Sequence, residues 1–501
     1  RLQSLPKTPR VEEKIYDLTE IIAQCLGLYI APVASVPFST SGDLVSAKIE
    51  ISNRSDEPIL LHRTSSDQLN FFENSKVTSI NPHETITVES LETSLGRQEP
   101  SNPYWLKYPT ESSRHVVPDP ELIGLPFGSE PVKINFEFSI NGRFFNLTRP
   151  LVYKKRDRVD GEVFSPFVLF PKLTVNASES VLIFNDKRSK KLNLTLRAHT
   201  DKLKGSLSLQ HNKFWKIKPK FIDFNLEATG QELVCEFEVF PPKNAQFGAI
   251  TPIAQIGDSF YSQRSIQINY PHIPKIRALE KTKTTLVKMN VEGTNLKVGY
   301  IQGAGDEVDQ GLTQLGYQVV AINPNTMTSD DLNNLDALVL GIRTYNTQEG
   351  LVSKSAMVNE YVNQGGLLLI QYQTTSGLLS SAMGPVGFKI GRDRVTDEQA
   401  AVDFLEPNHP IFSTPNILKM NDFDGWVQER GLYFAQSWDE QFTPLLGMND
   451  RDELQNQGAL ILAHYGKGTV IYTGLSFFRQ IPEGVSGAYK LLVNLLSYNH
   501  D

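Results

Sequence analysis

The sequence predicts a multidomain protein in which two all-β sandwich domains are followed by an α/β domain of flavodoxin-like layout. Three observations predict this. The chain has 501 residues, of which 40% are hydrophobic, and this exceeds what one core usually organises. Short runs of alternating apolar and polar residues, bounded by turn residues, fill the chain up to about residue 275. From residue 297 onward, apolar runs alternate with helical patterns over short connections.

Residues 1–30 are expected to form a lead-in helix from an upstream domain. The stretch VEEKIYDLTEIIAQCLGL has apolar residues at helical spacing, which predicts an amphipathic helix. The chain opens with RLQSLPKTPR, without an initiator Met or an apolar signal core. This opening is typical of a fragment or a processed product.

Residues 31–155 are expected to form the first β-sandwich and residues 156–275 the second. The clearest local signal is INFEFSINGRFFNLT, where Asn141-Gly142 separates two alternating runs. This dipeptide tolerates the positive φ angles of a tight hairpin turn. Residues 276–296 are charged and mixed in composition, so we expect a linker there.

Residues 297–501 are expected to form the α/β domain. KVGYI, YQVVAI, DALVLGI and LLLIQY read as buried strands, with helical patterns between them. GALILAHYGKGTVIYTGL reads as two strands joined by Gly466-Lys467-Gly468. Asp306, in the turn after the first of these strands, is expected to cap the following helix rather than to face a phosphate.

Charge and cysteine content exclude several classes of partner. The formal net charge is -7 with no long basic run, so we expect no nucleic-acid partner. The longest apolar stretch near the start, LGLYIAPVASVPF, is short and holds two prolines, so we expect no membrane span. Cys25 and Cys235 fall in different predicted segments, which argues against a disulfide framework.

Polar residues that follow the predicted strands are the first candidate ligand-binding residues. Ligands of open α/β sheets bind beyond the carboxyl ends of the strands. A guanidinium group beside aromatic rings and amides suits a hydroxylated or carboxylated ligand. The alternative is that these side chains cap strands and pair with loop carboxylates. The candidates are Arg343, Tyr345, Asn346, Gln371, Tyr372 and Arg479.

A second group of candidates lies in GRDRVTDEQAAVDFLEPNHPIF and NDFDGWVQERGLYF. Carboxylates can act as acids and bases when their environments separate their pKa values, and a Trp ring can be a platform for a sugar. The alternative is an ion network that fixes loops. The candidates are Arg392, Arg394, Asp424, Trp426 and Glu429.

No catalytic residue and no metal ligand is predicted. The nine histidines include no two within a helical turn of one another, and no pair of cysteines supports them. Ser476, in GLSFF, lacks the second glycine of a nucleophile elbow. We therefore expect no cofactor in this chain.

The motifs GRDRVTDEQAAVDFLEPNHPIF, GWVQERGLYF and YTGLSFFRQIPEGVSGAYKLLVNLL resemble the C-terminal region of large LmbE/PIG-L family deacetylases from Bacteroidetes. VEEKIYDLTEIIAQCLGLYI and SGDLVSAKIEISNRS resemble the middle of the same proteins, so the resemblance covers nearly the whole chain. It implies an upstream zinc-dependent N-acetyl-sugar deacetylase domain as partner, followed by β-sandwiches and a class I glutamine amidotransferase-like domain. It also implies a periplasmic or secreted location.

Two departures limit what the resemblance implies. The zinc motif of the deacetylase is absent from this chain, so zinc is expected only in the missing domain. GGLLLIQYQT resembles the strand that leads to the amidotransferase nucleophile, but Gln371 or Tyr372 holds the place of the cysteine. An amide cannot form a thioester, and a phenol without a base is a weak nucleophile.

The sequence therefore favours a non-catalytic accessory region that helps a deacetylase bind carbohydrate or another polar ligand. Two alternatives stay open. One is a hydrolase that uses Asp424 or Glu429 as its base. The other is a structural or dimerisation platform. The sequence leaves the ligand and the oligomeric state undetermined.

Overall fold

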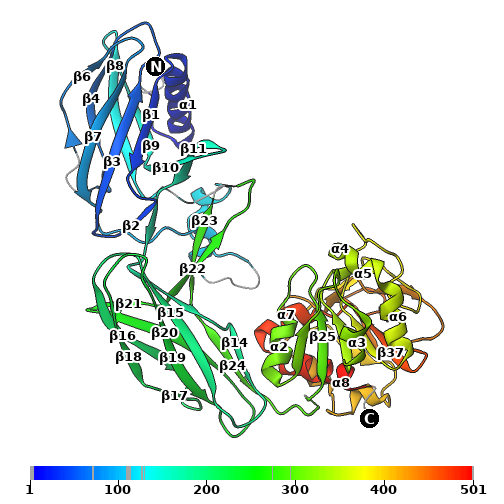
Figure 1. The fold of residues 1–501 in the computed structure, drawn as a ribbon. Coiled ribbons are helices and arrows are strands. Elements are labelled where there is room, and N and C mark those ends of the chain that lie inside the picture. The colour runs from blue at the N-terminus through cyan, green and yellow to red at the C-terminus, as the bar shows by residue number, and fades with distance from the viewer. Residues whose placement is uncertain are drawn as a thin grey trace.

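The structure is a computed structural model that describes residues 5–498 except 70–72, 109–113, 126–127, 129, 274 and 294. Three regions follow one another along the chain (Figure 1). An N-terminal β-sandwich carries helix α1 on its side, a second β-sandwich follows, and the C-terminal region lies beside the second sandwich. The prediction of β-sandwiches is thus confirmed.

The first sandwich encloses a core of alternating strand residues such as Ile49, Ile51, Phe136 and Phe138. The dipeptide Asn141-Gly142 joins β8 and β9 with φ angles of 48° and 75°, which confirms the predicted hairpin. One sheet has the order β11-β10-β1-β3-β7 and the other β5-β4-β8-β9, with β6 paired to β4. The elements are α1 (Pro9–Cys25), β1 (Tyr29–Ala34), β3 (Leu44–Ser52), β4 (Ile59–Ser65), β5 (Glu73–Asn74), β6 (Thr78–Ile80), β7 (Thr85–Ser94), β8 (Lys133–Ile140), β9 (Arg143–Pro150), β10 (Val152–Asp157) and β11 (Gly161–Pro166).

Two short strands and two 3-10 turns accompany this sandwich. Strand β2 (Phe38–Thr40) pairs in parallel with β12 (Val168–Phe170). The turns are η2 (Tyr104–Leu106) and η3 (Pro120–Leu122).

The second sandwich has a core that includes Leu194, Trp215, Phe237 and Leu286. One sheet has the order β13-β15-β19-β17, and the other has the order β14-β24-β20-β16-β18 with β21 paired to β20. The strands are β13 (Leu173–Ala177), β14 (Val181–Phe184), β15 (Lys190–Ala198), β16 (Leu203–His211), β17 (Lys216–Lys218), β18 (Phe221–Leu226), β19 (Glu232–Phe240), β20 (Gln246–Ile256), β21 (Ser259–Tyr261) and β24 (Thr284–Lys288).

The predicted linker 276–296 contains two strands. Strand β23 (Ile276–Lys281) pairs with β22 (Gln263–Ile268), and β24 pairs with both β20 and β14. All the strands that pair with β23 and β24 lie outside the segment 276–296. The charge pattern within the segment therefore does not predict the pairing. Tertiary contacts override local composition here.

The C-terminal region is built on a seven-stranded sheet with the order β26-β25-β27-β28-β37-β36-β34. The first five strands in this order are parallel to their neighbours, whereas β36 and β34 are antiparallel to theirs. The predicted hairpin at Gly466-Lys467-Gly468 is confirmed as the β36–β37 connection. The strands are β25 (Lys297–Ile301), β26 (Gln318–Ala321), β27 (Ala337–Leu340), β28 (Leu367–Ile370), β34 (Phe442–Pro444), β36 (Leu460–Tyr465) and β37 (Gly468–Thr473).

Helices and short antiparallel ribbons surround this sheet. The ribbons pair β29 with β33, β30 with β32, and β31 with β35. The ribbon strands are β29 (Phe388–Ile390), β30 (Arg394–Val395), β31 (Val402–Phe404), β32 (Gly431–Leu432), β33 (Ala435–Trp438) and β35 (Leu446–Met448). The helices are α2 (Val308–Leu315), α3 (Ser329–Asn333), α4 (Thr344–Thr347), α5 (Glu349–Ser353), α6 (Ser355–Asn363), α7 (Phe477–Glu483) and α8 (Ser486–Ser497), with the 3-10 turns η4 (Pro410–Phe412) and η5 (Met420–Phe423).

The predicted fold class is wrong in its flavodoxin-like, amidotransferase-like part. Strands make up 41% of the chain and helices 17%, so the protein is mostly β. A flavodoxin-like sheet is parallel. Here β36 runs antiparallel to the other six strands, and three antiparallel ribbons are inserted in the chain after β28. The sequence prediction failed because apolar runs look the same in parallel and antiparallel strands, and only long-range pairing distinguishes them.

One hydrophobic core joins the second sandwich to the C-terminal region. Val181, Ile183 and Val287 of the sandwich belong to the same buried cluster as Leu312 of α2 and Leu492 of α8. Gln314 of α2 adds two hydrogen bonds to β14, to the backbone of Ile183 (2.8 Å) and of Val181 (2.9 Å). None of the described helices is long and apolar enough to cross a membrane.

Candidate functional site

The carboxyl ends of β25 and β27 are held together by the partly buried side chain of Asp306. Its carboxylate accepts hydrogen bonds from the Tyr300 hydroxyl (2.5 Å), the Val308 amide (3.1 Å) and the Ile342 amide (3.1 Å). Burial raises the pKa of Asp306, and these hydrogen bonds oppose the rise. The N-cap position of α2 is Glu307, so the prediction that Asp306 is the N-cap residue is wrong by one position. Asp306 instead binds the first amide of the helix and fixes the turn that follows β27.

Arg343 follows this turn with an unusual backbone. Its φ is 57°, in the left-handed region, and its amide donates to the carbonyl of Tyr372 after β28 (2.9 Å). Its Nε atom is buried and has no hydrogen-bond partner in the described part of the chain. No carboxylate of the described residues lies within salt-bridge distance of its guanidinium group. Left-handed non-glycine residues of this kind are concentrated at functional sites.

Three aromatic rings gather at Tyr372, the residue whose carbonyl accepts from the Arg343 amide. Tyr372 stacks on Tyr433 at 6.1 Å between ring centroids and contacts Phe478 at 5.1 Å. Burial raises the pKa of Tyr372, although the nearby guanidinium groups of Arg343 and Arg479 lower it. The phenol is therefore protonated at neutral pH, so it can donate a hydrogen bond but is a poor nucleophile.

Arg479 completes this group of residues. Its Nε donates to Glu429 (2.9 Å), Nη1 donates to Gln428 (2.6 Å), and the guanidinium carbon lies 4.6 Å from the centroid of the Phe478 ring. Two guanidinium groups and one carboxylate leave this site with one positive charge. We call Arg343, Tyr372, Tyr433, Phe478, Arg479, Glu429 and Gln428 the strand-end cluster.

Five of the predicted ligand-facing residues are buried, namely Tyr345, Gln371, Tyr372, Trp426 and Glu429. Tyr345 is 1% exposed and packs in the hydrophobic core on one side of the sheet. Trp426 is 2% exposed, packs against Phe423, and donates its indole N–H to the Asp422 carbonyl (3.2 Å). These two positions do not fit the prediction, because local sequence patterns do not show which face of a loop is covered.

Gln371 is also buried, and its amide donates to the Tyr300 hydroxyl (2.9 Å) while its oxygen has no partner in the described structure. It therefore supports the Asp306 network rather than facing solvent. Asn346 is engaged at both amide atoms by the loop after β28, through Thr374 and Ser376. Neither side chain is free to bind a ligand.

Arg392, Arg394 and Asp424 are exposed. Arg392 approaches Thr375 at 3.5 Å, and Arg394 lies in β30. Asp424 lines a cavity together with Arg430, a residue that was not among the predicted candidates. Glu429 does not line this cavity, because its carboxylate turns toward Arg479.

Sequence reasoning missed Tyr433 and Gln428. Both have positive φ, 54° and 66°, which places their side chains in the strand-end cluster. Neither residue type signals such a backbone. Among the described residues, no three His, Cys, Asp or Glu side chains gather closely enough to hold a metal ion.

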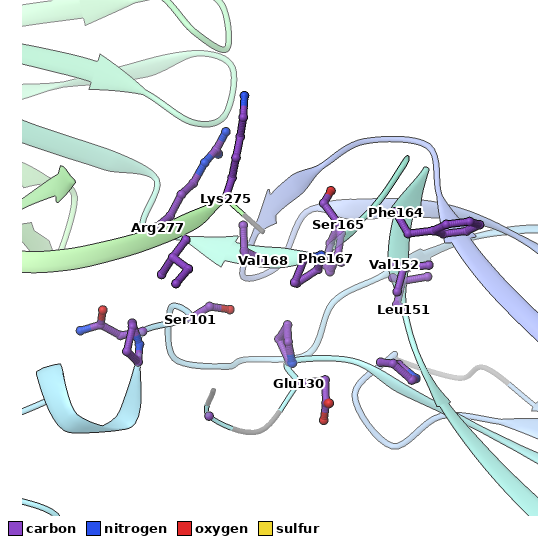
Figure 2. A pocket seen from close by; sticks show the side chains of 17 residues that line it. Ser101, Glu130, Leu151, Val152, Phe164, Ser165, Phe167, Val168, Lys275 and Arg277 are labelled. Atoms are coloured by element: carbon purple, nitrogen blue, oxygen red, sulfur yellow. The ribbon is translucent and has the colours of Figure 1, made fainter. Parts of the chain in front are cut away.

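A separate cavity of about 340 Å³ lies between the first sandwich and β23. Its lining is largely apolar and includes Leu151, Phe164 and Phe167 (Figure 2). Two of the charged residues that line the cavity interact with other residues. The Arg277 guanidinium lies over the rings of Phe38 and Phe170, and Glu130 pairs with Lys133 (3.2 Å). A binding cavity needs a few polar groups that orient the ligand. Because Arg277 and Glu130 are engaged elsewhere, we take the strand-end cluster as the candidate site.

Comparisons with known proteins leave the family open. No family model and no curated protein matches the chain. Among solved structures, native α2-macroglobulin of Escherichia coli matches with 9% identity and a TM-score of 0.18, covering 53% of this chain and 17% of its own. Red sea bream transglutaminase matches with 8% identity and a TM-score of 0.24, covering 57% and 34%.

A third match is the exo-β-1,4-mannosidase Op5Man5 from an Opitutaceae bacterium, with 10% identity, a TM-score of 0.25, and coverage of 41% and 35%. The chain thus spans about a third or less of the length of these three proteins. None of the three is named as a deacetylase or an amidotransferase. Similarities this low do not assign a function to the chain.

Proposed function

We propose that this chain is a non-catalytic accessory region of a zinc-dependent N-acetyl-sugar deacetylase, and that its strand-end cluster binds a carboxylated saccharide. The deacetylase context comes from the resemblance of the long C-terminal motifs. The binding role is supported by one observation above all, the Arg343 guanidinium group. It has a buried Nε without a partner and no carboxylate within salt-bridge distance in the described structure.

The surrounding residues suit a carboxylated sugar. A guanidinium group can hold a carboxylate through two parallel hydrogen bonds. The neutral phenol of Tyr372 supplies a donor, and the partly exposed rings of Tyr433 and Phe478 supply apolar faces for sugar C–H groups. Glu429 and Gln428, which are held by Arg479, supply acceptors for hydroxyl groups. These residues can bind a ligand, but they include no activated nucleophile.

The hydrolase alternative has less support from the geometry. It requires a carboxylate that is free to take a proton from water. Glu429 is engaged by Arg479 at 2.9 Å, and Asp424 lines a different cavity, so the two carboxylates do not form a pair around one substrate.

Replacing Arg343 with methionine is expected to weaken binding of glucuronate by about tenfold or more, because the charged double hydrogen bond is lost. Methionine keeps much of the side-chain length and meets the same backbone strain. Isothermal titration calorimetry of wild type and R343M with glucuronate, and with glucose as the neutral match, measures this effect.

Arg451→Met is the control, because Arg451 is 92% exposed and lies outside the cluster. It should bind glucuronate like the wild type. Equal affinity of wild type and R343M for glucuronate, with both proteins folded, would contradict the proposal. Equal affinity of the wild type for glucuronate and glucose would do the same.

A further inference from the structure

A cavity of about 450 Å³ is lined by Arg430, the residue that follows Glu429 of the strand-end cluster. These two successive residues point to different sites: Glu429 pairs with Arg479, and Arg430 lines the cavity. Asp403, Phe423 and Asp424 are among the other lining residues. The cavity is thus separate from the strand-end cluster but close to it along the chain.

Arg430 is a buried cation with unused hydrogen-bond donors. It is 4% exposed, and burial lowers its pKa, whereas the carboxylates of Asp424, Asp397 and Glu398 oppose this effect. Its Nε (3.1 Å) and Nη2 (2.8 Å) donate to the Ala400 carbonyl, and Nη1 donates to the Phe423 carbonyl. A guanidinium group has five N–H donors. Two therefore have no partner in the described structure, and none of its acceptors is a carboxylate.

The carboxylates at the cavity are exposed. One oxygen of Asp403 accepts from Gln455 at 2.6 Å. The Asp424 side chain has no hydrogen bond or ion pair within the described residues. With Arg430 as the only cation among the described lining residues, the lining carries one net negative charge. This is opposite in sign to the charge of the strand-end cluster.

We propose that this cavity binds an amino sugar, a hydroxylated ligand with one protonated amine. Arg430 donates to ring or hydroxyl oxygens from the cavity wall, and Asp424 accepts from the ammonium group. Phe423 and Met420 provide the apolar surface against which the sugar C–H groups pack. A neutral polyol would leave the excess carboxylate unpaired, and an acidic sugar would be repelled by it. The proposal rests on the cavity and is independent of the proposed function of the strand-end cluster.

Titrating the intact chain with glucosamine, glucose and N-acetylglucosamine tests this proposal. The three probes share most hydroxyl groups, and only glucosamine carries a charged amine at neutral pH. We expect glucosamine to bind about tenfold or more tightly than either of the others, because only it forms the ion pair with Asp424. Asp424→Asn should abolish this preference without affecting folding, because the residue is exposed.

Asp452→Asn is the matched control, because Asp452 is 92% exposed and lies outside the cavity. It should keep the wild-type preference for glucosamine. R343M should also keep it, so a failure of the strand-end cluster can be told apart from a failure of the cavity. Equal affinity for the three probes, no binding of glucosamine, or an unchanged preference in D424N would each overturn the proposal.

Discussion

Replacing Asp306 with alanine is expected to destabilise the C-terminal sheet by about 3–5 kcal/mol, because a partly buried acceptor shared by three donors is lost. The Tyr300 hydroxyl and the amides of Val308 and Ile342 would all lose their partner. Hydrogen exchange followed by mass spectrometry measures the effect in β25 and β27, as the free energy of local opening.

Asp306→Asn is the matched variant for this prediction. It keeps one acceptor oxygen, so we expect its free energy of local opening to lie between those of the wild type and D306A. Because Asp306 also fixes the turn before Arg343, D306A should weaken glucuronate binding as well. Surface substitutions usually change the free energy of unfolding by no more than about 0.5 kcal/mol. A free energy of local opening for β25 and β27 in D306A that stays within this range of the wild-type value would contradict the role of Asp306.

Acidification is expected to destabilise the second sandwich through His199. This side chain stacks on Phe170 at 4.5 Å, and its Nε2 lies 3.0 Å from the Thr174 hydroxyl. Burial, with Arg197 and Arg277 nearby, lowers its pKa to about 4. The unfolded chain takes up this proton near pH 6.5, before the folded chain does, so stability falls as the pH drops from about 6.5 to about 4. The total loss from this residue is about 3 kcal/mol.

Urea unfolding of wild type and His199→Phe at pH 7 and pH 4.5 measures this contribution. Phenylalanine keeps the stacking on Phe170 but cannot titrate. The variant should therefore lose less stability on acidification than the wild type, whatever its stability at pH 7. The same loss in both proteins would show that His199 does not set this pH dependence.

Local signals in the sequence predicted the parts of the fold that depend on local structure. The hairpin at Asn141-Gly142 is an example, because only a few residue types accept two consecutive positive φ angles. In contrast, the segment that forms β24 was expected to be a linker. It is a strand because its partners β20 and β14 stabilise it across the sheet. Its own composition gives no such signal.

The candidate site was predictable only in part, for a similar reason. Arg343, Tyr372 and Arg479 lie near one another, as expected for residues that follow strands of one sheet and meet at its edge. Tyr345 and Trp426 looked equally suitable, but tertiary packing covers both. The Arg430 cavity depends on which side of one segment each residue faces, and no local pattern encodes this.

The two sites carry opposite net charges, so we predict different ligand preferences for them. Among the described residues, Arg343 of the strand-end cluster forms no salt bridge with a carboxylate, and Asp424 of the cavity forms none with a cation. An accessory region with both sites could hold a polysaccharide that bears carboxylate and amine groups. The two preferences can be measured independently, since no residue of the strand-end cluster lines the cavity.

The central claim is that the strand-end cluster binds a carboxylated saccharide without converting it. The most direct measurement is a calorimetric titration of the intact wild-type chain with glucuronate, followed by chromatography of the recovered ligand and mass spectrometry of the protein. We predict saturable binding, unchanged ligand and unmodified protein. The absence of saturable binding, a converted ligand, or a covalent adduct on the protein would contradict the account.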